Sequence, residues 1–115
     1  MSVLSKYVPR RPLTVETLSH IEGRLRDVLR GRVEEAYLFG SASTGSFEPA
    51  SDIDLILIKG SALPFAARGT EFLDLFAIYP ALDILVYTPA EFDQLMNTPG
   101  PGLWQSVRES KRRLL

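Results

Sequence analysis

Apolar residues recur at intervals of three and four positions between residues 14 and 31, and this spacing predicts an amphipathic helix. The apolar stripe comprises Val15, Leu18, Ile21, Leu25, Val28 and Leu29. Thr14 precedes the stripe as a suitable N-cap, and Gly31 follows it as a suitable stop. His20 lies off the stripe, so we expect it at the solvent-exposed surface.

Three later segments are rich in apolar residues and predict strands. They are residues 34–39 (EEAYLF), 52–58 (DIDLILI) and 81–87 (ALDILVY). The small polar residues 41–50 leave room for a turn and one helical turn between the first two strands. Both faces of 52–58 are apolar beyond its two aspartates, which predicts a central position in the sheet.

Helical spacing returns after the second strand. Residues 64–79 predict a helix that turns five large residues inward, namely Phe65, Phe72, Leu73, Leu75 and Phe76. The remaining segments are a short helix over 90–97, a break at 98–102 and a last helix over 103–111. This order of elements predicts an α/β (α+β) fold in which a small mixed β-sheet is flanked by helices.

The composition limits the class of protein. A chain of 115 residues has the length of one ordinary domain, so we expect a single domain over 13–115 behind a flexible arm at 1–12. A net charge of −1 provides no overall attraction to nucleic acid or to an anionic membrane. No apolar segment reaches the roughly 18 residues that span a bilayer, and no signal-peptide core is present. We therefore expect a cytoplasmic protein that contacts no membrane and binds no nucleic acid directly.

The residue types that bind metals narrow the chemistry. The chain has no cysteine and one histidine, which excludes thiolate sites and His-rich zinc sites. Any metal must therefore be bound mainly by oxygen, and this favours Mg²⁺, Ca²⁺ or Mn²⁺.

Aspartates interrupt two of the predicted strands near their first residues. Asp52 and Asp54 point to the same strand face, roughly 6–7 Å apart. Asp83 lies near the start of a later strand and falls opposite this pair if the two strands are neighbours. Three carboxylates without partners repel one another strongly, and divalent cations would remove that repulsion. The alternative for Asp52 is a strand-end cap or an arginine pair.

Gly40 and Ser41 end the first strand and add the second part of a site. Glycine lets a phosphate approach the backbone, free amides at a following helix start bind the anion, and a serine hydroxyl adds a donor. Phosphate donors beside metal-binding carboxylates are what phosphoryl or nucleotidyl transfer requires. The carboxylates open their strand, which disfavours a phosphatase-like site, and no P-loop motif occurs.

These residues resemble the signature of the DNA polymerase β-like nucleotidyltransferase superfamily, and in particular its minimal nucleotidyltransferase (MNT) domains. That signature is Gly-Ser, ten residues, then Asp-x-Asp, and here it reads Gly40, Ser41, Asp52, Ile53 and Asp54. Asp83 matches the third carboxylate of the family. The resemblance covers residues 14–115, and 101–115 resemble the closing helix and short basic strand of these domains.

The resemblance implies a polymerase β-like fold and a metal-dependent transfer of a nucleoside monophosphate, usually AMP from ATP. Asp52 and Asp54 would bind two Mg²⁺ ions, and Asp83 would bind one of them while helping to deprotonate the acceptor hydroxyl. Gly40 and Ser41 would bind the triphosphate, and we expect Ser51 beside them in the nucleotide site.

The resemblance also implies a partner. Many such small domains are the antitoxins of helical HEPN ribonuclease toxins, and some silence the toxin by adding AMP to a tyrosine. An oligomer is possible, and the acceptor and the base preference stay open.

One departure from the family pattern concerns the cation that usually follows Gly-Ser. The related domains carry an arginine there, whereas this chain has Ser43 and Thr44. Lys59, Arg68 or a side chain of the partner could substitute.

Two other functions therefore remain open. A catalytically weak or inactive module could neutralise its partner by contact, with Leu103, Trp104 and Val107 as partner surface, although Trp104 suits core packing better. Transfer to a small molecule is the less favoured alternative. The basic cluster at 108–113 is expected to be a solvated helix end.

Overall fold

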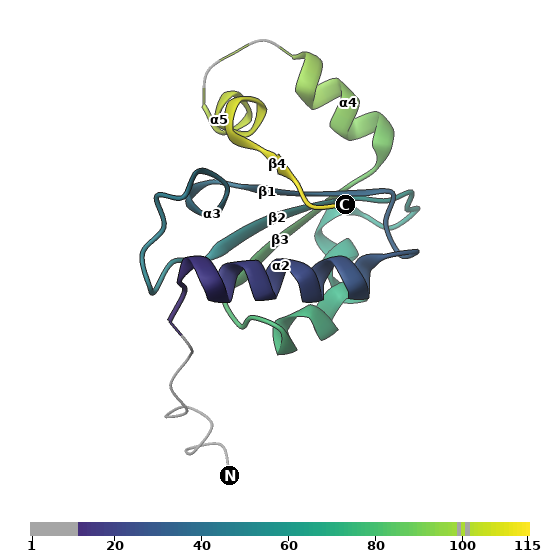
Figure 1. Cartoon of the computed structure of the whole chain (residues 1–115). Coiled ribbons are helices and arrows are strands. Elements are labelled where there is room, and N and C mark those ends of the chain that lie inside the picture. Colours follow the sequence, from purple (N-terminus) through teal and green to yellow (C-terminus); the bar gives the residue numbers. More distant parts are fainter. Residues whose placement is uncertain (1–11, 99, 101) are drawn as a thin grey trace.

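The computed structural model describes residues 12–98, 100 and 102–115, so the arm expected at 1–12 lies almost wholly outside the described residues. Figure 1 shows the elements along the chain. They are helix α2 (Val15–Leu29), strand β1 (Glu35–Phe39), helix α3 (Ser41–Thr44), strand β2 (Ile53–Ile58), 3₁₀ helix η1 (Phe65–Ala77), strand β3 (Leu82–Tyr87), helices α4 (Pro89–Asn97) and α5 (Leu103–Ser110), and strand β4 (Arg112–Arg113).

The strands form one mixed sheet in the order β3-β2-β1-β4. β1 runs antiparallel to both β2 and β4, and β2 runs parallel to β3. β2 therefore lies inside the sheet, as its apolar faces predict. The predicted fold class, a small mixed sheet flanked by helices, is confirmed, and so are the short basic strand and the helix before it.

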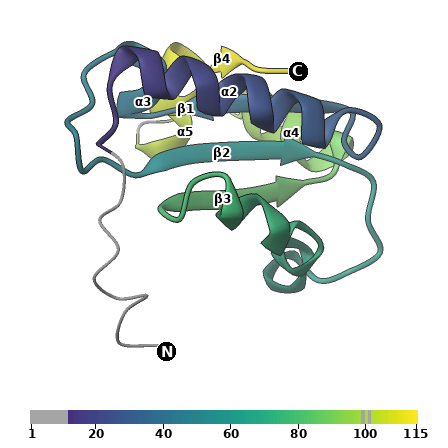
Figure 2. The ribbon, with the colours of Figure 1, turned by 60° about the horizontal axis from the view of Figure 1, so that its bottom comes forward.

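Helices cover both faces of the sheet (Figures 1 and 2). α2 and η1 pack on one face, where the odd-numbered residues of β2, such as Leu55 and Leu57, are fully buried. α4 and α5 pack on the other face, where Ile56 and Ile58 meet Phe92. The alternation of side chains along β2 thus supplies two cores. Each buried aliphatic side chain contributes about 1.5–3 kcal/mol of transfer free energy.

A capping box starts α2 where the sequence predicts it. The Thr14 hydroxyl accepts the Thr17 N–H at 3.1 Å, and the Thr17 hydroxyl accepts the Thr14 N–H at 2.7 Å. The predicted stripe is partly wrong, because Val15 is 77% exposed and Val28 is 36% exposed. At about 100° per residue these two positions flank a buried face centred on Leu25, which is completely inaccessible.

The predicted helix over 64–79 is a 3₁₀ helix with a break at Phe72, whose φ is −123° and ψ 20°. Phe72 and Leu75 are buried, as predicted. The prediction is wrong for the other three residues, because Phe65, Leu73 and Phe76 are exposed. With three residues per turn, Phe72 and Leu75 share one face, while Leu73 and Phe76 share the next face, toward solvent.

The C-terminal segment packs into the second core. Val107 is completely buried, and Trp104 is half-buried with its ring edge-on to Tyr87 at a centroid distance of 5.2 Å. Trp104 therefore packs against this core, and the alternative that Val107 forms partner surface is wrong. The side chain of Leu103 lies outside the described part of the structure. Arg108 is also not a solvated helix end, because it donates to the carbonyls of Thr98 and Gly100.

Arg68 of η1 is only 6% exposed and holds the C-terminal end of β3 to α4. Its guanidinium donates to the Leu63 and Val86 carbonyls and to both carboxylate oxygens of Glu91. Glu91 in turn accepts the Thr88 N–H and so completes the cap of α4. The Arg68 guanidinium and the Thr88 N–H lower the pKa of Glu91 to about 2.

This lowered pKa predicts how stability depends on pH. The ionised Glu91 contributes fully to the free energy of unfolding above the ordinary pKa of 4.5, and this contribution is lost as the pH falls toward 2. We expect Glu91→Gln to lower the thermal midpoint by several degrees at pH 6, because a buried guanidinium loses its counter-charge. In a series of thermal melts, the difference in thermal midpoint between Glu91→Gln and the wild type should disappear as the pH falls from 4.5 to 2. Glu34→Gln, at an exposed glutamate, is the matched control and should show no such gap. A gap that stays constant with pH would contradict the assignment.

Among the described residues, no helix is both long enough and apolar enough to cross a membrane.

Candidate functional site

Three strand ends lie side by side at one end of the sheet, which is called the carboxylate edge below. Because β1 runs antiparallel to β2, and β2 parallel to β3, the end of β1 lies beside the starts of β2 and β3. Asp54 pairs with Phe39 on one side and with Asp83 on the other. Gly40 follows Phe39 directly, so the candidate phosphate-binding and metal-binding residues of the sequence converge at this edge.

Asp54 and Asp83 lie in register on neighbouring parallel strands and point to the face that carries Ile56 and Leu85. Neighbouring strands are about 4.8 Å apart, so the two carboxylates are close. Asp54 is half-buried, whereas Asp52 and Asp83 are exposed. Burial, and next the negative charges of Asp83 and Asp52, raise the pKa of Asp54. The three aspartates predicted to act together are therefore electrostatic neighbours.

The donor set suits a hard cation. Within the described part of the chain, none of Asp52, Asp54 and Asp83 forms an ion pair, so the alternative of an arginine pair for Asp52 finds no partner there. Among those same residues, no group of three acidic or imidazole side chains is gathered around one point that could bind a metal. Mutually repelling oxygen ligands nevertheless fit Mg²⁺, which these carboxylates would hold and which would neutralise them.

Gly40 occupies a position that no other residue fits. Its φ of 69° lies in the left-handed region, and a Cβ at this position would lie 2.5 Å from Oδ2 of Asp54. Gly40 is also the N-cap of α3 and provides no side-chain cap to that helix. The hydroxyl of Ser41, the next residue, has no hydrogen-bond partner within the described chain. Backbone and hydroxyl donors thus stand beside the Asp54 carboxylate, where a phosphate could be bound.

The other hydroxyls of this loop are used within it. Ser43 donates to the Gly40 carbonyl at 2.7 Å. The Ser51 hydroxyl accepts the Glu48 N–H at 2.8 Å, and the Ser51 carbonyl accepts the Tyr79 hydroxyl. Ser51 therefore shapes the turn before β2, and its role in nucleotide binding stays a prediction.

The two cations considered as replacements for the missing arginine lie elsewhere. Lys59 follows the far end of β2, roughly 16 Å along the strand from Asp54, and pairs with Glu71 at 2.8 Å. Arg68 is held by Glu91 near the far end of β3. Neither lies at the carboxylate edge, so both expectations are corrected. Sequence order alone did not show which end of the sheet each cation occupies.

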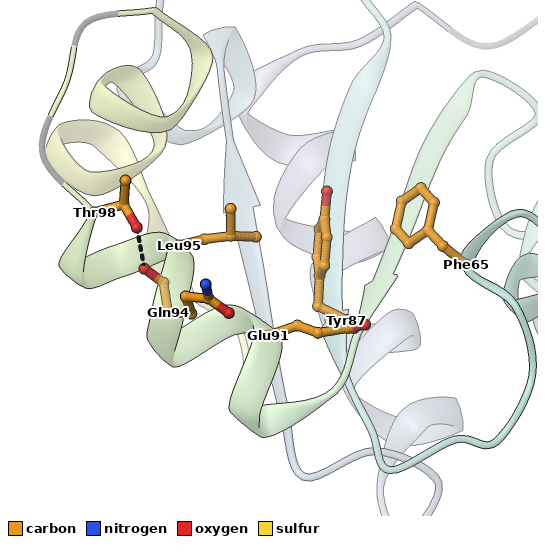
Figure 3. A pocket seen from close by; sticks show the side chains of 6 residues that line it. All are labelled: Phe65, Tyr87, Glu91, Gln94, Leu95 and Thr98. Carbon is orange, nitrogen blue, oxygen red and sulfur yellow. Dashed lines mark hydrogen bonds between the residues drawn. The ribbon is translucent and has the colours of Figure 1, made fainter.

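A pocket of about 330 Å³ opens at the far end of β3 (Figure 3). Its lining residues are Phe65, Tyr87, Glu91, Gln94, Leu95 and Thr98. The rings of Phe65 and Tyr87 form one wall at a centroid distance of 5.0 Å. Tyr87 lies four residues beyond Asp83, roughly 13 Å along the strand, so the pocket is separate from the carboxylate edge. The sequence did not predict this pocket, because three separate elements form it.

Comparisons with known proteins agree with this geometry. The sequence profile of the nucleotidyltransferase domain family matches residues 18–70, which contain the Gly-Ser and the Asp-x-Asp. A search of curated protein sequences found no match.

Solved structures share the fold. A Sulfolobus solfataricus protein assigned as a nucleotidyltransferase matches with a TM-score of 0.59 at 19% identity, over 86% of this chain and 83% of that one. A toxin–antitoxin structure with AMP-PNP matches with a TM-score of 0.57 at 23% identity, over 82% and 72%. A complex of a tri-AMPylated Shewanella oneidensis HEPN toxin with an MNT antitoxin matches with a TM-score of 0.53 at 20% identity, over 85% and 71%. Residues 18–70 thus match the nucleotidyltransferase domain family, and the chain shares its fold with these solved structures.

Proposed function

We propose that this protein transfers AMP from ATP to a hydroxyl of a partner protein, and that the partner is a HEPN-type toxin for which this chain is the antitoxin. The observation that carries the proposal is the pairing of Asp54 with Asp83 beside Gly40 at one sheet edge. The similar folds in a toxin–antitoxin structure with AMP-PNP and in a complex with a tri-AMPylated HEPN toxin support the nucleotide and the partner.

The proposed reaction is a single displacement at the α-phosphorus of ATP. Gly40 and Ser41 hold the triphosphate through backbone and hydroxyl donors, and Asp83 takes the proton of the acceptor hydroxyl. The acceptor oxygen forms a bond to the α-phosphorus, the bond to the bridging oxygen breaks, and pyrophosphate leaves with that electron pair. Two Mg²⁺ ions, when bound by Asp52 and Asp54 with Asp83, supply charge neutralisation at the phosphates.

A label-transfer assay tests the proposal. The protein is mixed with Mg²⁺ and lysate of its source cell, in one arm with α-³²P-ATP and in the other with γ-³²P-ATP. We expect label on a protein band from the α-labelled nucleotide alone, because the γ-phosphate leaves within pyrophosphate. Label from the γ-labelled nucleotide alone would indicate a kinase instead, and the mass of the labelled band identifies the acceptor.

The second candidate is a module that neutralises its partner by contact. It is favoured by one observation, since Ser43 and Thr44 stand where a cation would follow Gly-Ser and both hydroxyls bond within α3. This alternative predicts no label in either arm and full neutralisation of the toxin by Asp54→Asn. Transfer to a small molecule would put the label in the soluble fraction rather than on a protein.

A further inference from the structure

We infer that Lys111 is the cation that binds the β- and γ-phosphates of the nucleotide, in place of an arginine after Gly-Ser. The inference rests on the proposed function and assigns one further substrate-binding residue. It comes from a segment about seventy residues away from Gly40 in the sequence.

Most basic side chains of the described structure are already bound within the protein. Carboxylates or backbone carbonyls bind every described lysine and arginine except Arg24 and Lys111. Arg24 is on α2, which covers the opposite face of the sheet from the carboxylates. Lys111 is therefore the available cation on the carboxylate face of the described structure.

The strand register puts Lys111 at the same end of the sheet as the carboxylates. Arg112 in β4 pairs with Leu38 in β1, and the two strands are antiparallel. Lys111, one residue earlier, therefore lies alongside Phe39, which pairs with Asp54. Figures 1 and 2 show α5, which ends directly before Lys111, over the same end of the sheet as α3.

The side chain of Lys111 lies on the same face of the sheet as the carboxylates. Arg112 reaches α2 and pairs with Glu22, on one face of the sheet. Lys111 takes the opposite direction, with Nζ 6.0 Å from the ring centroid of Tyr37. Tyr37 belongs to the core cluster of Phe39 and Ile56, on the face of Asp54. Lys111 and the carboxylates thus share one face as well as one edge.

The distance from Lys111 to the carboxylates suits a bound phosphate chain. Two strand spacings separate Lys111 from Asp54, about 10 Å between Cα atoms, and Gly40 lies between them. Suppose that the α-phosphate of ATP lies beside Asp54 and that the end of the phosphate chain contacts Gly40 and Ser41. The chain would then extend toward Lys111. The contact with the Tyr37 ring is weak, and a flexible ammonium side chain readily exchanges it for phosphate oxygens.

The test compares the binding of AMP, ADP and ATP in the presence of Mg²⁺ by isothermal titration calorimetry. We expect Lys111→Met to weaken ATP binding by roughly 10- to 100-fold, the loss of one charge-assisted contact, and to leave AMP binding unchanged. Lys111→Arg should keep most of the affinity. Arg24→Met is the matched control, because it removes the other cation of the described residues that has no carboxylate or carbonyl partner, on the opposite face, and it should bind ATP as the wild type does.

The outcomes separate this inference from the function on which it rests. ATP binding by Lys111→Met at wild-type affinity, or an equal loss for AMP and ATP, overturns the assignment of Lys111 alone. A wild-type protein that binds none of the three nucleotides overturns the proposed function together with this inference. A circular-dichroism melt of each variant establishes that it is folded before it is titrated.

Discussion

Asp54→Asn should reduce AMP transfer by roughly 1,000-fold or more, because it removes a carboxylate ligand from the metals that stabilise the charge of the transition state. Asp54 is central in the candidate site, paired with Asp83 and next to Gly40. The change keeps the size of the side chain, so the fold should persist. The measurement is the rate of label transfer from α-³²P-ATP to the acceptor. Asp27→Asn, on the exposed surface of α2, is the matched control and should transfer at the wild-type rate.

The same variant should be more stable than the wild type when Mg²⁺ is absent. The folded-state pKa of Asp54 is raised above its unfolded value, so the ionised carboxylate costs stability at neutral pH. Below the ordinary pKa of 3.8 the wild-type side chain is neutral in both states, and the advantage of asparagine should vanish. Thermal melts at pH 7 and pH 3 measure this difference, and millimolar Mg²⁺ should reverse it at pH 7.

Two results would contradict this account of Asp54. Transfer by Asp54→Asn at the wild-type rate would remove Asp54 from the site. An unchanged thermal midpoint at pH 7 would mean that neither burial nor the charges of Asp83 and Asp52 disfavour the ionised Asp54 carboxylate in the folded protein.

Gly40→Ala should lower transfer by about 100-fold through a displacement of the Asp54 carboxylate. The added Cβ would lie 2.5 Å from Asp54 Oδ2, closer than van der Waals contact allows. The carboxylate must therefore move, and a shift of about 1 Å at a reacting centre costs on the order of 100-fold in rate. The measurement is again label transfer, under saturating nucleotide, so that binding and rate can be separated.

Gly45→Ala is the control for a glycine with positive φ and no close neighbour. Gly45 has a left-handed φ of 79°, and no described atom outside its immediate chain neighbours lies within 4 Å of the position that a Cβ would take there. Gly45→Ala should lose about 1 kcal/mol of stability from its αL conformation, and Gly40→Ala should lose more, roughly 1–3 kcal/mol, because φ 69° with ψ −151° is a conformation almost exclusive to glycine. Gly45→Ala should nevertheless keep its activity. Equal losses of activity in the two variants would show that backbone strain, and not the Asp54 carboxylate, causes the effect.

Local patterns in the sequence predicted much of the fold. The continuous apolar run of β2 gives two buried faces, and this requires a strand covered by helices on both sides. The capping threonines of α2 and α4 are equally local signals, since each bonds within its own first turn. The sequence reveals Gly40, Ser41 and the Asp-x-Asp because they lie close together along the chain, joined by a short link in one hairpin-like unit.

Errors occurred where tertiary packing decided the outcome. Leu73 and Phe76 satisfy a helical period of 3.6, but η1 has three residues per turn and turns them to solvent. Lys59 and Arg68 were available as cations in the sequence, yet both are held at the far end of the sheet. The spacing of residues along the sequence does not indicate at which end of the sheet a distant side chain lies.

Local sequence patterns predict the strands, the carboxylates and the glycine beside them, because apolar runs and turn residues are features of a few neighbouring positions. The three-dimensional fold instead sets Asp83 in register with Asp54, buries Arg68 against Glu91, and brings Lys111 beside Phe39 through β4. These arrangements depend on pairing between strands far apart in the chain. The free energy of such pairing comes from packing over the whole sheet, which no local pattern records.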